Sequence, residues 1–565
     1  MNGNGVPRVE VPFLVVGAGP TGMTLARLLA NAGRRCLIVE RRDGPQPNPS
    51  AHVVNARTLE IFRQGGLDMR AIDAIAKPPR DSGHVSFVTR LNGELIGRLP
   101  FERQGDECLD HTPTPLRNIS QHRLEPVMAA AIADAPEIDL RYDTEWVSST
   151  QDDDGVTSVI RDRRTEVETT VRSAYLLAAD GAGSVVRKSL GIEMIGPQSL
   201  QDFVAIHVMA NLRPYVAERL GVLHFVMDPE VSGVFIAHDL DRESVFMVAY
   251  DSATQPADDF TPARCAEIVR GAIGDDAAEL EVARVGTWHM TAQVAEHMQR
   301  GRAFLVGDAA HRFPPTGGMG LNTGVADAHN LAWKLQAVVD GWAAPTLLDS
   351  YEVERLPVAH TNCQQSATNA FKMVLLADAL ALHPGATSAD LAATLADPAN
   401  AERIAAGVQA QATHFDMLGL QLGYVYADGA LVRDREPPAP IEDPSRFEPT
   451  AEVGSRLPHG WLDDGRSTLD LVRADRMTLL TSGAHDRWAD AIASVTVPLE
   501  QIRLGDDVET GADWRARCRL DGDGALLVRP DQHIAWRAAT LPADPTISLR
   551  DALTSVLGAG ASPAV

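Results

Sequence analysis

Three glycines near the N-terminus have the spacing of a phosphate-binding turn. Gly17, Gly19 and Gly22 form a GxGxxG pattern after the apolar run Val11–Val16, and the helical segment TLARLLANAG follows them. The first glycine permits a tight turn, the second lets a pyrophosphate approach the backbone, and the third lets helix and strand pack closely. The helix N-terminus would face the phosphates. The pattern predicts a dinucleotide site but does not distinguish FAD from NAD.

A carboxylate stands at the end of the next expected strand. The run Cys36–Glu40 (CLIVE) is apolar until Glu40, where a carboxylate is placed to accept hydrogen bonds from an adenosine ribose. Strand, glycine turn, helix and second strand together make a βαβ unit. This context supports dinucleotide binding more strongly than a lone GxGxxG pattern would.

A second segment with chemical potential, Ala303–Leu335, combines a carboxylate with a loop rich in proline and glycine. An apolar strand would deliver Asp308, and a helix is expected to start around Leu321–Asn322. Such a start directs N–H groups and the positive end of the helix dipole at whatever lies in the loop. The arrangement suits a reduced flavin, which carries negative charge. Taken alone, the segment is equally compatible with a loop that only caps a core helix.

The motifs occur in an order that resembles the single-component FAD-dependent aromatic hydroxylases typified by p-hydroxybenzoate hydroxylase. They are the GxGxxG turn with Glu40, the DG motif at Asp180 and Gly181, and the GD motif at Gly307 and Asp308. NARTLEIF, PTPLRNISQHRLEPVM and HRFPPTGGMGLNTG are similar to phenol and chlorophenol hydroxylases and to hydroxylases that tailor polyketides and other natural products. The resemblance spans nearly the whole chain.

The resemblance implies where FAD would be bound. The GxGxxG turn, Glu40 and Arg41 would hold the ADP half, while Gln121 and Asp308 would lie near the ribityl chain. Many members have an arginine after the proline at position 49, whereas this chain has Ser50, so Arg57 or Arg42 is expected at the phosphates instead. The expected cofactor contacts are Gly17, Gly19, Pro20, Thr21, Gly22, Glu40, Arg41, Arg57, Gln121, Asp180, Gly181, Gly307, Asp308, Pro315, Gly320, Leu321 and Asn322.

The resemblance also implies a reaction. NADH or NADPH would reduce the flavin, O2 would add at C4a, and the hydroperoxide would hydroxylate a phenolic or polyketide-type aromatic ring. No second GxGxxG is present in the sequence, which favours transient docking of the nicotinamide. Pro315 would border the reacting oxygen, and a basic side chain near the substrate hydroxyl would help. Candidates for that side chain, each more often structural than catalytic, are His52, His224, His238 and Tyr250.

Other activities share this scaffold. A Baeyer–Villiger-type enzyme and a flavin oxidase are poorly separated from a hydroxylase by sequence. A flavin-binding protein without turnover is the alternative from a different class. A halogenase would carry a WxWxIP segment, which the sequence lacks.

Composition changes along the chain suggest a mixed α/β protein with three parts. A Rossmann-type FAD-binding domain with a helical extension would carry an inserted, mainly antiparallel substrate domain, and a proline-rich linker would lead to a separate C-terminal domain. The segments GSRLPHGWLDDGRSTLDL and LLVRPDQHIAWR resemble the thioredoxin-like C-terminal domain of the larger family members. The expected ranges are 1–80, 100–190 and 286–425 for the first, 81–99 and 191–285 for the second, and 426–565 for linker and third.

Bulk properties favour a cytoplasmic protein. The net charge of -25 disfavours nucleic acid and anionic membranes as partners, and no apolar run approaches the roughly 18 residues that a membrane-spanning helix needs. Five dispersed cysteines without a CxxC pair indicate reduced thiols and exclude dithiol chemistry in the C-terminal domain. No metal site is expected. A small aromatic substrate, O2 and NAD(P)H are the expected partners, and a homodimer is typical of the family.

Overall fold

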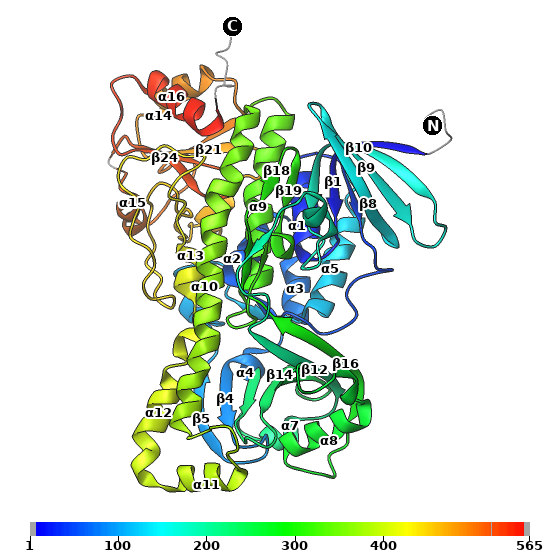
Figure 1. Ribbon diagram of the computed structural model, residues 1–565. Coiled ribbons are helices and arrows are strands. Elements are labelled where there is room, and N and C mark those ends of the chain that lie inside the picture. The colour runs from blue at the N-terminus through cyan, green and yellow to red at the C-terminus, as the bar shows by residue number, and fades with distance from the viewer. Residues whose placement is uncertain (1–6, 521, 559–565) are drawn as a thin grey trace.

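A parallel sheet forms the centre of the molecule in the computed structural model, which describes residues 7–520 and 522–558 (Figure 1). The strand order β19-β10-β1-β2-β7 is parallel throughout, and β18 closes one edge in the antiparallel sense. The apolar runs of β1 and β2 are buried, as expected for strands covered on both faces. The strands are β1 (Arg8–Val16), β2 (Cys36–Val39), β7 (Ile138–Arg141), β10 (Glu168–Ala178), β18 (Gln299–Arg300) and β19 (Ala303–Leu305), with the hairpin β8 (Thr144–Asp152) and β9 (Gly155–Asp162) beside β10.

Two helices that follow the glycine-rich turns pack against each other beside this sheet. They are α1 (Pro20–Asn31) and α9 (Met319–Val339). Helix α9 begins at Met319, ahead of the expected start at Leu321–Asn322, because Gly318 takes a left-handed conformation (φ 61°) as its N-cap. The other helices of this domain are α2 (Ala56–Gln64), α3 (Met69–Ile75), α4 (Pro79–Ser82), α5 (Gln121–Ala133) and α6 (Val185–Ser189).

A helical extension links the two ends of the molecule. Helix α10 (Asp349–Ala379) runs from beside the C-terminal domain to the sheet that contains β4 and β5, and α11 and α12 follow there (Figure 1). No helix in the described part of the chain is long and apolar enough to cross a membrane. The remaining helices of the extension are α11 (Ser388–Ala396), α12 (Ala401–Gln409) and α13 (Leu418–Gly423).

A seven-stranded sheet forms the inserted domain, with order β16-β12-β15-β14-β13-β4-β5. All neighbours are antiparallel except β13 and β4. The expected boundary at residue 285 falls inside β16, because pairing with β12 continues through Trp288 and His289. The elements are β4 (His84–Val88), β5 (Leu95–Pro100), β12 (Gln201–Met209), β13 (Leu223–Val226), β14 (Gly233–Asp239), β15 (Glu243–Tyr250), β16 (Glu281–Met290) and α8 (Pro262–Ile273). Smaller pieces are the pair β3 (Val53–Val54) and β6 (Arg117–Asn118), and the sheet of β11 (Met194–Ile195), β17 (Gln293–Ala295) and β20 (His311–Arg312).

The C-terminal domain has the thioredoxin-like arrangement expected from the sequence. Its sheet has the order β22-β21-β23-β24, with a parallel first pair and an antiparallel final hairpin. Cys518 is a buried free thiol, and burial raises its pKa well above the usual value. The elements are β21 (Met477–Thr481), α14 (His485–Ala493), β22 (Leu499–Arg503), α15 (Ala512–Cys518), β23 (Ala525–Val528), β24 (Ile534–Ala538) and α16 (Pro545–Leu557).

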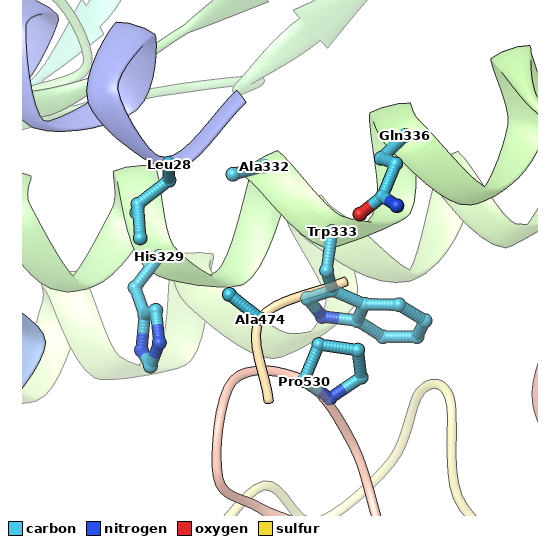
Figure 2. Close-up of a pocket in the computed structure, with 7 residues that line it drawn as sticks. All are labelled: Leu28, His329, Ala332, Trp333, Gln336, Ala474 and Pro530. Carbon is cyan, nitrogen blue, oxygen red and sulfur yellow. The ribbon is translucent and has the colours of Figure 1, made fainter. Parts of the chain in front are cut away.

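This domain is joined to the domain of the parallel sheet by a shared core. Trp333 and Ala337 of α9 pack in one apolar cluster with Met477 and Trp488 of the C-terminal domain. A small cavity remains at the junction, where side chains of α1 and α9 meet two loops of the C-terminal domain (Figure 2). The residues lining it are Leu28, His329, Ala332, Trp333, Gln336, Ala474 and Pro530.

A buried ion cluster fixes the same junction. The guanidinium of Arg529 donates to both carboxylate oxygens of Glu354 on α10, at 2.7 and 2.9 Å, and to Asp531. Lys334 of α9 donates to Glu354 at 2.8 Å, and the side chains of this cluster are 0–1% exposed. Buried charges are tolerated only when they are paired in this way.

Removing one member of the cluster should therefore destabilise the fold. Arg529→Leu leaves Glu354 and Asp531 without their shared cation and should lower the free energy of unfolding by about 3–5 kcal/mol. Arg503→Leu, which removes an exposed pair with Asp507, is the control and should leave stability unchanged. Urea unfolding followed by tryptophan fluorescence measures both, and equal stability of the two variants would contradict this role of the cluster.

Candidate functional site

The first glycine turn is tight on one side and open on the other. A Cβ on Gly17 (φ 105°) would lie 2.3 Å from the Ala179 carbonyl oxygen, and one on Gly22 would lie 2.0 Å from the Gly17 carbonyl oxygen. A Cβ on Gly19 would meet no atom within 4 Å. Gly19 is also the N-cap of α1 and supplies no side-chain cap, so the first N–H groups of the helix remain free for an anion.

Glu40 lies immediately beside this turn. Its Oε2 accepts a hydrogen bond from the Ala18 N–H at 2.9 Å, and its Oε1 accepts from the backbone N–H and Nε of Arg42 at 3.0 Å each. Burial opposes ionisation, but the bonds from Arg42 and Ala18 hold the pKa of Glu40 below its usual value. Arg42, not the exposed Arg41, is therefore the arginine that contacts the Glu40 carboxylate.

Gln121 is linked to Arg42 and Glu40 through Glu125, a carboxylate that was not among the expected site residues. Gln121 Nε2 donates to Glu125 Oε1 at 2.7 Å, and Arg42 lies 3.4 Å from Glu125 Oε2. Glu125 also accepts from the Gln46 N–H at 2.6 Å. Glu125 is fully buried, and its bonds to Arg42 and to the Gln46 N–H fix the loop after Glu40. Gln121 lies at the start of α5.

Asp308 combines exposure to solvent with dense protein surroundings. The side chain is solvent-accessible, yet desolvation raises its pKa, only partly offset by His311 and Arg312. The first turn of α9 lies beside it, since a Cβ on Gly320 would be 3.9 Å from Asp308 Oδ1. The preceding Gly307 (φ 62°) approaches Thr21 of α1, whose Oγ1 would be 2.9 Å from an added Cβ. The two glycine-rich turns therefore meet, and Asp308 is a carboxylate open to a ligand.

A second carboxylate supports the GD turn from behind. Asp327 of α9 accepts from the Gly307 N–H at 3.2 Å, from His311 Nε2 at 2.7 Å and from Arg355 Nε at 2.7 Å. All three side chains in these ion pairs are fully buried. Neither Asp327 nor Arg355 was expected from the sequence, since they pair across two helices.

The loop before α9 is attached to the segment after His52. Asn322 Oδ1 accepts from the Asn55 N–H at 2.9 Å and from Thr58 Oγ1 at 2.7 Å, and its Nδ2 donates to the Val53 and Gly318 carbonyls. This side chain thus orders the loop instead of facing outward. Leu321 is half-buried and Pro315 is exposed at the loop tip.

The DG motif lies next to the first glycine turn. Asp180 accepts from Ser184 Oγ at 2.6 Å and from the Val185 N–H at 2.8 Å, so it orders the start of α6. A Cβ on Gly17 would lie 3.1 Å from the Asp180 Cα. Gly181 (φ 79°) has open space where a side chain would be.

Arg57 is buried among protein partners and does not present its guanidinium to a ligand, contrary to the expectation for it. It is 2% exposed, and it donates to Glu60 at 2.9 Å, to Gln532 Oε1 at 2.6 Å and to the Asp531 carbonyl at 2.9 Å. These three partners are buried, and two of them, Asp531 and Gln532, belong to the C-terminal domain. The physical reason is that domain's docking against α2, which the local sequence around Arg57 does not reveal.

Of the four substrate-side candidates, the structure brings two together. The rings of His52 and His238 are 6.0 Å apart, and the His52 ring is 6.2 Å from that of Phe101. His52 directly precedes Val53, which Asn322 holds against the loop. Burial lowers the pKa of His52 to about 4, so this imidazole is neutral at physiological pH.

The other two candidates lie in the core beneath α8. His224 pairs across the strands with Phe235, a residue of that core, and Tyr250 packs on Phe260 at 5.2 Å. Lys77, which the sequence did not mark, donates to the Ala237 carbonyl at 2.6 Å, next to His238, and burial lowers its pKa to about 7. Within residues 7–520 and 522–558, no group of acidic, histidine and cysteine side chains is arranged to hold a metal ion.

Comparisons with known proteins match the chain almost from end to end. The profile described as "FAD binding domain" covers residues 10–366, and "Aromatic-ring hydroxylase, C-terminal" covers residues 450–560. A putative polyketide hydroxylase of Streptomyces halstedii is 35% identical over 98% of both chains. The 2,4-dichlorophenol 6-monooxygenase of Cupriavidus pinatubonensis is 33% identical over 97% of both. The solved flavin-dependent monooxygenase PieE, in complex with FAD and substrate, superposes with a TM-score of 0.91 at 34% identity, covering 98% of this chain and 99% of that one.

The open and tight sides of the glycine turn predict different outcomes for two alanine variants. Gly19→Ala should leave the thermal stability of the apoprotein unchanged but raise the Kd for FAD at least about tenfold, because the methyl group would enter the open space in which the pyrophosphate is expected. Gly22→Ala should lower both stability and affinity, since its Cβ would clash with the Gly17 carbonyl.

Gly286→Ala is the matched control, because its Cβ also meets no atom within 4 Å but lies on β16 of the inserted sheet. Differential scanning fluorimetry and FAD fluorescence titration measure the two properties. Unchanged FAD affinity of Gly19→Ala would contradict the assignment of this turn to the pyrophosphate.

Proposed function

The chain belongs to the FAD-dependent aromatic-ring hydroxylases, and from this membership we propose that it hydroxylates a phenolic or polyketide-type ring with O2 and NADPH or NADH. The family matches confirm the expected FAD cofactor and the monooxygenase class. The polyketide and phenol substrates named for the relatives define the substrate classes to be tested here. Soluble aromatic compounds of both classes are therefore the starting panel.

The residues around both glycine turns fit an FAD molecule that lies along them. The open turn at Gly19 and the free N–H groups of α1 would receive the pyrophosphate, with Glu40 at the adenosine ribose. Asp308 would accept hydrogen bonds from the ribityl hydroxyls. When bound and reduced, the flavin supplies the electrons that activate O2. The uncapped N-terminus of α9 at Gly318 would stabilise negative charge on the ring.

One observation carries the proposed substrate position: His52, fixed to the flavin-side loop through Val53, reaches His238 of the inserted sheet. A substrate held between the two domains would therefore meet groups from both. Phe101 and Phe225 approach Phe415 at 6.1 and 6.0 Å and supply an apolar aromatic wall. Such a wall suits a flat ring and excludes water from the reaction.

The neutral His52 imidazole is the group proposed to accept a hydrogen bond from the substrate hydroxyl. Its Nδ1 is 3.0 Å from Asn118 Oδ1, so the amide oxygen accepts from Nδ1–H and leaves Nε2 as the free acceptor. A phenol becomes a better nucleophile toward electrophilic oxygen as its proton leaves. Because the pKa of His52 is about 4, this acceptor is present throughout the neutral range.

The activity is tested with the purified holoprotein. We expect a flavin absorbance spectrum, slow NADH or NADPH oxidation alone, and faster oxidation with a hydroxylated product when a phenol or hydroxynaphthoquinone is added. Hydrogen peroxide without product would instead indicate an oxidase, and an ester or lactone product would indicate Baeyer–Villiger chemistry. A protein that cannot be reconstituted with FAD would exclude the proposal altogether.

His52→Phe should preserve FAD content while lowering kcat/KM for the best substrate at least about tenfold, the size of one lost hydrogen bond. Phenylalanine keeps the ring contact with Phe101 but removes the hydrogen-bond acceptor. His360→Phe, an exposed change on α10, is the control and should behave as wild type. Steady-state kinetics between about pH 6 and 9 should show no activity loss from protonation of His52, because its pKa is about 4. Wild-type kinetics in His52→Phe would refute this role.

A further inference from the structure

Glu102, two residues after the end of β5, has an unusual backbone for its residue type. Its φ of 51° lies in the left-handed region, which non-glycine residues rarely adopt and which is often found at functional sites. The Glu102 N–H donates to the Phe415 carbonyl at 2.6 Å, so the helical extension holds the residue in this conformation. The backbone thereby turns the side chain toward the segment Phe415–Gln421.

The Glu102 carboxyl is bound through only one of its oxygens. Oε2 accepts from the Met417 N–H at 3.4 Å and from Gln421 Nε2 at 3.0 Å. Among the described residues, no hydrogen bond to Oε1 is found. The side chain is partly accessible to solvent although protein surrounds it closely. Burial, together with the charge of Asp416, raises the pKa of Glu102 to about 8, so the carboxyl keeps its proton at neutral pH.

Both neighbours of this carboxyl touch the proposed reaction site. Phe101, the preceding residue, stacks on His52 at 6.2 Å. Met417, which donates to Glu102, contacts the loop before α9, since a Cβ on Gly317 would lie 2.3 Å from its Cε. Glu102 is therefore connected on one side to the substrate wall and on the other to the flavin loop.

None of the charged groups described around Glu102 forms an ion pair with its carboxyl. Asp416 forms an ion pair with Arg103, whose Nε and terminal nitrogen lie 3.1 and 2.9 Å from one carboxylate oxygen. The Cys108 thiol is neutral, because burial raises its pKa to about 12. On the far side of Phe101, His52 is neutral as well. Glu102 is thus a neutral acid, and its Oε1 accepts no hydrogen bond from the described residues.

We propose that Glu102, in its protonated form, donates a hydrogen bond to a carbonyl or hydroxyl oxygen of the aromatic substrate. This role rests on the proposed function and narrows the substrate to rings that carry an oxygen acceptor, such as phenols and quinones. Buried carboxyls kept neutral at pH 7 act as hydrogen-bond donors in other enzymes. Ionisation of Glu102 removes the donor and places a negative charge against that oxygen.

The test measures binding of phenol and of 5-hydroxy-1,4-naphthoquinone to the oxidised holoenzyme by perturbation of the flavin spectrum. For wild type, Kd should rise about tenfold between about pH 6.5 and 9, which corresponds to the loss of about one hydrogen bond. Glu102→Gln keeps a neutral donor, so its Kd should match wild type at the lower pH and stay flat within about twofold. Glu107→Gln, an exposed change in the same loop, should retain the wild-type pH dependence. A pH-dependent Kd in Glu102→Gln, or a flat one in wild type, would overturn the proposal.

A second measurement does not require a bound substrate. Since the pKa of Glu102 is raised from 4.5 to about 8 in the fold, its stabilising contribution is present at low pH and is lost as pH rises through about 8. Glutamine does not titrate, so the Tm of Glu102→Gln minus that of wild type should grow by about 2 °C or more between about pH 5 and 8.5. A constant difference would show that Glu102 is an ordinary carboxylate and refute the role. Failure of both probes to bind, with this Tm trend present, would count against the proposed function alone.

Discussion

The Asp327 carboxylate accepts hydrogen bonds from the Gly307 backbone, His311 and Arg355, and so ties the GD turn to α9 and α10. Because these ion pairs are fully buried, the three elements cannot move apart without leaving a charge unpaired, at a cost of several kcal/mol. Asp308 follows Gly307 directly. The position of the solvent-accessible carboxylate that would hold the ribityl chain therefore depends on the inaccessible one behind it.

Helix α10 also connects this buried ion cluster to the C-terminal domain. Arg355 is adjacent in sequence to Glu354, which binds Arg529 and Lys334. Tyr426 joins the two ion clusters, since its hydroxyl lies 3.3 Å from Arg355 and its ring 5.3 Å from the Arg529 guanidinium carbon. The thioredoxin-like domain has no paired thiols to use, and its contribution is instead to pack behind α9 and α10 and hold the charges that fix them.

The sequence predicts those features of the fold and site that rest on local chemistry. The βαβ unit can be predicted because glycine is required where backbone segments approach closely. Glu40 and Asp308 can be predicted because each stands at the end of an apolar strand. Contacts between residues that are far apart in the sequence cannot be predicted in this way. Arg57 is paired with Gln532, 475 residues away, and Glu102 with Gln421, 319 residues away. Likewise, His238 turns toward His52 at a bulge in β14, whereas His224 faces the core, a distinction that residue type does not encode.

The two glycine turns, the solvent-accessible Asp308 and the proposed substrate position between two domains are those of an enzyme that transfers one atom of O2 to an aromatic ring. The most direct measurement is turnover of the best substrate under dioxygen labelled with oxygen-18, with the product analysed by mass spectrometry. Our account predicts one labelled oxygen atom in each product molecule and one NAD(P)H consumed for each. Label entering only from water, or hydrogen peroxide equal to the NAD(P)H consumed, would contradict it.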